Sequence, residues 1–92
     1  MAKSSQSQAH DRIKHDLRDK LEVLIGEQVL HVLGKPHDLL RVQVRELWPG
    51  NYRVNVLLGA DMASARVAYS YFLAADSDGN ITSSVPQIVK QY

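Results

Sequence analysis

The sequence has no cysteine, and this absence excludes disulfide bridges, thiolate zinc sites, iron–sulfur clusters and a cysteine nucleophile. It also has almost no net charge: 11 Lys and Arg stand against 10 Asp and Glu, which gives a formal charge of +1 at pH 7. Such a balance predicts no strong bulk attraction to nucleic acid or to anionic membranes. No run of about 18 apolar residues is present, so we expect no membrane-spanning helix.

The start of the chain has no apolar stretch of the kind that a signal peptide requires, and we therefore expect a cytoplasmic protein. Residues 1–7 are small and polar, a composition typical of a disordered tail. The rest of the chain, residues 8–92, has the length of one domain with a modest core.

The first half of this domain has the apolar spacing of a helix. From about Gln8 to Leu33, large apolar residues recur at intervals of three and four, with Gln28 as an exception within the stripe. Gly34 and Pro36 then predict the end of the helix, because glycine adopts the left-handed conformation cheaply and proline disfavours helix in the preceding residue. Gly26 predicts a kink, a break or close packing against a sheet.

The two halves of the predicted helix differ in polarity. Residues 10–20 are mostly charged and residues 21–33 are mostly apolar, so we expect only the second half to be buried. A helix of this length is longer than a small sheet is wide, and its first half should overhang the sheet. The overhang is either a solvated extension or a docking surface for a second copy or a partner.

After Pro36 the apolar period changes from about 3.6 to two, which predicts strands near 39–45, 52–58, 66–74 and 81–85. Trp48-Pro49-Gly50-Asn51 and Asp76-Ser77-Asp78-Gly79-Asn80 have the composition of turns. The sequence therefore predicts a two-layer α+β domain, with a long N-terminal helix packed on a three- to four-stranded antiparallel meander.

Alternation along these strands predicts a polar outer face. If Val42, Val44, Val54 and Val56 point inward, the outward set is Arg41, Gln43, Arg45, Arg53, Asn55 and Arg66, with Phe72 among them. In the third strand, alternation places Val67, Tyr69, Tyr71 and Leu73 on the inner face. Four arginines on one face are suited to binding carboxylates or phosphates, although a merely solvated face is the simpler interpretation. Nucleic acid is disfavoured by the near-zero charge and the few aromatic residues.

Other motifs give little indication of chemistry. No pair of the four histidines has a metal-binding spacing, and the segment from Asp76 to Asn80 fits a hairpin better than a calcium loop. No serine has the context of an activated nucleophile. We therefore expect no metal and no cofactor, and we favour a non-enzymatic role over an enzymatic one.

The leading hypothesis is a small non-enzymatic interaction module that self-associates, as a homodimer. One alternative is a ligand or enzymatic pocket between helix and sheet, lined by Tyr52, Tyr69, Tyr71 and Trp48 with His31 or His37 as its polar group. Another is an acidic protein partner, an acidic ligand or RNA bound by the arginines. Trp48 is either an exposed anchor for a partner or a lid on the core. The candidate binding residues are Arg41, Arg45, Arg53, Arg66, Trp48 and Tyr52.

Overall fold

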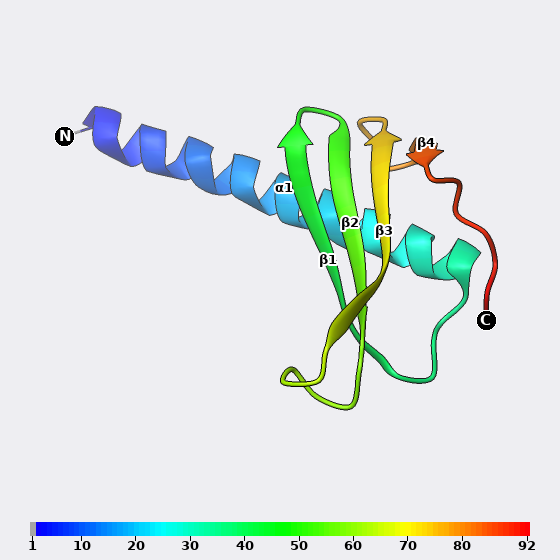
Figure 1. Ribbon diagram of the computed structural model, residues 1–92. Helices are drawn as coiled ribbons and strands as arrows, with labels where there is room; N and C mark the ends of the chain where they lie inside the picture. The colour runs from blue at the N-terminus through cyan, green and yellow to red at the C-terminus, as the bar shows by residue number, and fades with distance from the viewer. Residues whose placement is uncertain (1) are drawn as a thin grey trace.

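The computed structural model describes the backbone of residues 2–92 and the side chains of residues 17–92. The helix α1 (Ala2–Leu33) is followed by four strands: β1 (Leu39–Trp48), β2 (Asn51–Leu58), β3 (Arg66–Ala75) and β4 (Ile81–Val85). The strands form one antiparallel sheet in the order β1-β2-β3-β4, with α1 across one face (Figure 1). The predicted α+β layout of a helix and a meander is confirmed.

The N-terminal part of α1 continues past the β1 side of the sheet (Figure 1). α1 begins at Ala2 rather than near Gln8, so its backbone includes residues 2–7 of the predicted tail. Side chains before residue 17 lie outside the described residues, so the docking role of the overhang stays a prediction. No helix in the described part of the chain combines the length and the apolarity needed to cross a membrane.

The core lies between the second half of α1 and the facing side of the sheet. Ile25, Val29 and Leu33 follow one another at intervals of four, and all three are completely buried. This spacing places them on one side of the helix, as the apolar period predicts. The sheet contributes the other buried members of this cluster: Tyr52, Val54, Val56, Leu58, Tyr71 and Leu73.

Gly26 lies within an unbroken helix, and its role is close packing. A Cβ built at this position would lie 3.4 Å from Cγ2 of Val44 and 3.6 Å from Cγ1 of Val42. These are ordinary contact distances, so α1 packs directly against β1 at this position. Of the three expectations for Gly26, close packing against the sheet is the one that the structure shows.

The helix ends at Leu33, and Gly34 follows in the left-handed region with a φ of 89°. The backbone N–H groups of Gln91 and Tyr92 donate to the Leu33 carbonyl at 2.8 and 3.1 Å. The last residues of the described chain therefore return to the C-terminal end of α1 (Figure 1). The hydroxyls of Tyr69 and Tyr92, 2.9 Å apart, hold the same segment against β3.

Both predicted turns are confirmed. In the hairpin between β3 and β4, Gly79 has a φ of 84°, and Oδ1 of Asp76 accepts from the backbone N–H groups of Asp78 at 3.0 Å and Asn80 at 2.9 Å. These hydrogen bonds hold the pKa of Asp76 below its ordinary value, with the Asn80 N–H as the largest cause.

Gln28 connects α1 to this hairpin, because its side-chain amide donates to the Gly79 carbonyl and its side-chain carbonyl accepts from the N–H of Ile81 at 3.2 Å.

One part of the predicted face assignment is wrong. Val56 pairs with Tyr69 but Leu57 pairs with Val67, so an extra residue, Ala68, bulges out of β3. The bulge reverses the alternation of side chains beyond it. Val67 is consequently exposed and Ala68 packs against the core, opposite to the expectation from simple alternation.

Candidate functional site

The open face is the sheet face opposite α1, and three rows of cross-strand neighbours define it. The first row is Arg41, Leu57 and Val67; the second is Gln43, Asn55 and Ser70; the third is Arg45, Arg53, Phe72 and Val85. In the second row the hydroxyl of Ser70 donates to Oδ1 of Asn55 at 2.7 Å.

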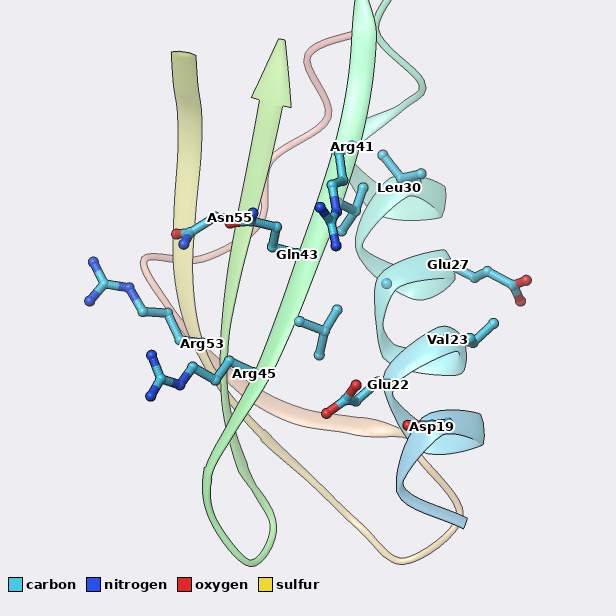
Figure 2. A pocket seen from close by; sticks show the side chains of 13 residues that line it. Asp19, Glu22, Val23, Glu27, Leu30, Arg41, Gln43, Arg45, Arg53 and Asn55 are labelled. Carbon is cyan, nitrogen blue, oxygen red and sulfur yellow. The ribbon is translucent and has the colours of Figure 1, made fainter. Parts of the chain in front are cut away.

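Three of the four predicted arginines share the open face. Arg41, Arg45 and Arg53 are all exposed, and Arg45 and Arg53 are direct neighbours across β1 and β2. Figure 2 shows Arg45 and Arg53 extending away from the helix. Like charges directly opposite each other destabilise a sheet by up to about 1 kcal/mol. An anion placed between the two guanidinium groups would remove that repulsion.

The fourth arginine, Arg66, does not belong to this group. The bulge in β3 pairs Arg66 with Leu58, which is a core residue. Arg66 therefore lies at the helix-facing side of the sheet. There the hydrogen bond to Tyr69 raises the pKa of the Tyr92 hydroxyl, and the charge of Arg66 opposes part of that rise. The expectation that Arg66 shares a face with Arg41 and Arg53 is wrong.

An apolar cluster adjoins the arginines at the end of the sheet. It consists of Leu47, Trp48, Phe72 and Val85, whose exposed fractions are 37%, 61%, 51% and 68%. These side chains surround a hollow of about 180 Å³. Contiguous exposed apolar side chains of this kind are typical of interaction surfaces. The exposure of Trp48 is the arrangement that the anchor hypothesis requires.

Tyr52 also lines the hollow, but it is a core residue rather than an exposed contact. Burial, together with the charge of Glu46 and a hydrogen bond to it, raises the pKa of the Tyr52 hydroxyl. Of the two predicted aromatic site residues, Trp48 is therefore exposed to solvent, whereas Tyr52 is buried and lines the inner side of the hollow.

A groove of about 850 Å³ runs between α1 and β1 (Figure 2). Its helix wall contains Glu22, Val23, Gly26 and Leu30, and Figure 2 shows Glu22 extending toward β1. Its sheet wall is formed by the segment of β1 from Arg41 to Arg45, with Arg53 and Asn55 behind.

The groove is not the pocket expected from the sequence. Tyr69, Tyr71, Trp48, His31 and His37 do not line it, and core side chains fill the space between the helix and the middle of the sheet. Nor do three or more His, Asp or Glu side chains gather as metal ligands anywhere in residues 17–92.

Sequence reasoning identified Trp48, Phe72 and three arginines, but it missed two parts of the site. Leu47 and Val85 lie on separate strands, and only the register of the sheet brings them to the same hollow. The helix wall of the groove depends on how closely α1 packs against β1, for which Gly26 was the available signal.

Comparisons of the chain with models of protein families, with curated proteins and with solved structures find no match.

Proposed function

We propose that this chain is a non-enzymatic interaction module that self-associates as a homodimer through the apolar cluster. The observation that supports this proposal is the joint exposure of Leu47, Trp48, Phe72 and Val85 around one hollow. Tryptophan is among the residues that contribute most to binding when an interface buries them. While the four apolar side chains of the cluster remain exposed to water, the chain lacks the favourable free energy that their burial in an interface would provide.

A second copy fits this surface because the cluster contains both a projection and a recess. In a two-fold dimer each contact occurs twice, so a residue that projects must meet a complementary recess on the same surface of its partner. Trp48 is the most exposed aromatic ring of the cluster, and the hollow beside it is lined by Phe72 and Val85. The formal charge of +1 produces little repulsion between two copies.

The alternative of a ligand pocket between the layers has less support, because core residues occupy that space. Catalysis has no observation in its favour among the described side chains. The acidic-partner alternative concerns a different surface, the arginines and the groove beside them.

Sedimentation equilibrium over a wide concentration range tests the dimer. We expect a mass that rises from 10.3 kDa toward twice that value, and a Trp48→Ala dimer that is at least about tenfold weaker. Met62→Ala is the matched control, because Met62 is equally exposed but lies in the loop between β2 and β3. A chain that stays at 10.3 kDa at every concentration contradicts the proposal, as does equal weakening by both substitutions.

A further inference from the structure

The two edges of the sheet differ in their capacity to accept another strand. β4 has five residues and is followed directly by Pro86, which has no N–H to donate. β1 has ten residues, and within residues 2–92 no strand pairs with its outer side. An edge strand of that length presents a row of free backbone donors and acceptors. β1 therefore offers the longer edge for strand addition, and β4 the shorter one.

The middle of β1 is regular enough to serve as a template. Its irregularities lie between Leu39 and Arg41 and between Glu46 and Trp48, which leaves a continuous run from Arg41 to Glu46. Bulges and proline, two of the means of preventing strand addition, are absent from this run. Charged side chains are a third means, and here Arg41 and Arg45 disfavour a basic strand rather than every strand.

The groove provides the space that an added strand would occupy. A neighbouring strand lies about 4.8 Å from β1 in the plane of the sheet. On the β1 side of the molecule, we infer that this position falls in the groove beside β1 and α1, which is lined by residues of both elements. The groove-facing side chains of such a strand would contact Val23, Leu30, Val42 and Val44.

The charges on the two walls determine which strand fits. On the open face, Arg41 and Arg45 flank Gln43, so acidic side chains of the added strand would lie about 5 Å from them. On the groove side, the helix wall carries Asp19, Glu22 and Glu27, and Glu22 extends toward β1, so a carboxylate placed there would be repelled (Figure 2). The favoured occupant has acidic residues at alternate positions, separated by apolar ones.

A second copy of β1 would meet like charges in several pairing registers at the same edge. In antiparallel pairing centred on Gln43, Arg41 of one copy lies opposite Arg45 of the other, twice. Pairing centred on either arginine places that residue opposite itself. Pairing centred on Val42 or Val44 instead places an arginine opposite Gln43, without a like-charge pair. Like-charge pairs therefore disfavour three of these five self-pairing registers, whereas an acidic strand brings opposite charges to Arg41 and Arg45.

We propose that β1 is an acceptor for an extended acidic segment of a partner protein, which adds a fifth strand to the sheet and lies in the groove beside α1. The arginines provide specificity for acidic side chains, and backbone pairing along Arg41–Glu46 provides much of the affinity. This site is separate from the apolar cluster. If the chain proves to be monomeric, the dimer proposal fails, but the proposal of strand addition at β1 is not affected.

The test uses the whole chain and a short, end-blocked peptide of alternating Glu and Val at low salt. We expect binding that slows amide hydrogen exchange at Arg41–Glu46, and no binding of the peptide with Lys in place of Glu. Reversal of two charges, in the variant Arg41→Glu/Arg45→Glu, should weaken binding by about tenfold and allow the Lys peptide to bind. Arg66→Glu is the control, because it reverses an arginine that is also exposed but is not among the groove-lining residues.

Several results overturn the proposal: no binding, equal binding of the Glu and Lys peptides, protection outside β1, or equal loss in the Arg66→Glu variant. A Glu/Val peptide methylated on its backbone nitrogens must also bind less tightly than the unmethylated peptide. Equal affinities of the two peptides would mean that ion pairs, without strand addition, account for binding. Slowed exchange at Arg41–Glu46 on raising the protein concentration without peptide would show instead that a second copy occupies the edge.

Discussion

The guanidinium carbon of Arg53 lies 5.2 Å from the centre of the Phe72 ring, and the two residues are direct partners across β2 and β3. This contact joins the basic and the apolar parts of the open face. It also orients the exposed Phe72 ring at the hollow beside Trp48. A cation over an aromatic face contributes about 0.5–1 kcal/mol at an exposed site.

A double-mutant cycle measures this contact. We expect Arg53→Gln and Phe72→Leu to show a coupling energy of about 0.5–1 kcal/mol in urea unfolding, because either substitution removes the cation–π interaction. Arg41 pairs across β1 and β2 with Leu57 rather than with an aromatic residue, so the pair Arg41→Gln and Phe72→Leu is the control. A coupling energy near zero for Arg53 and Phe72 would show that the contact is not stabilising.

Gln28 is predicted to be a stabilising residue of α1 despite its position within an apolar stripe. Gln28→Met removes hydrogen bonds to the backbone of Gly79 and Ile81, and we expect a loss of about 1–3 kcal/mol in the free energy of unfolding. Glu27→Met, at the exposed neighbouring position, should change it by less than about 0.5 kcal/mol. A stability gain in Gln28→Met would contradict the role of this side chain.

The two glycines of the α1 region should respond in opposite directions to alanine. Gly26→Ala is expected to stabilise the protein by up to about 1 kcal/mol, because the new Cβ makes ordinary contacts with Val42 and Val44 and alanine favours helix. Gly34→Ala is expected to cost at least about 1–2 kcal/mol, because φ is 89° and the Cβ would lie 2.6 Å from the Tyr92 carbonyl oxygen. Thermal unfolding of both variants checks this; destabilisation by Gly26→Ala would mean that α1 and β1 cannot accommodate a methyl group.

The hairpin at Asp76 should contribute to stability only when this residue is ionised. Because folding lowers the pKa of Asp76 below its ordinary value of 3.8, the contribution is complete above that pH and is lost as the pH falls through the folded value. We expect Asp76→Asn to be less stable than the natural chain near neutral pH, with a difference that shrinks on acidification. Urea unfolding as a function of pH measures this, with Ser77→Ala as the control. A difference that stays constant to pH 2 would contradict the assignment.

The layout of the fold could be predicted because it depends on local patterns. The change of apolar period after Pro36, the glycine at the helix end and the turn composition from Asp76 to Asn80 each act within a few residues. The bulge at Ala68 has no such local signal, since both Val67 and Ala68 are apolar and either can face the core. Simple alternation therefore assigns Arg66 to the wrong face of the sheet.

The candidate site was less predictable than the fold. Arg41, Arg45 and Arg53 followed from alternation on two adjacent strands, which no bulge interrupts between Arg41 and Glu46. The apolar hollow requires the register of three strands, and the groove requires the approach of α1 to β1. Gln28 was an exception in the apolar stripe because its partners, the backbone of Gly79 and Ile81, lie about fifty residues away in the chain.

The most direct test of the proposed dimer is the fluorescence of Trp48, which is the only tryptophan in the chain. Emission and quenching by iodide report on the exposure of this one ring. With rising protein concentration, the dimer predicts emission at shorter wavelength and weaker quenching, because Trp48 enters the hollow of the second copy. An emission maximum and a quenching constant that stay unchanged while sedimentation shows dimers would place the interface elsewhere and contradict the role of the apolar cluster.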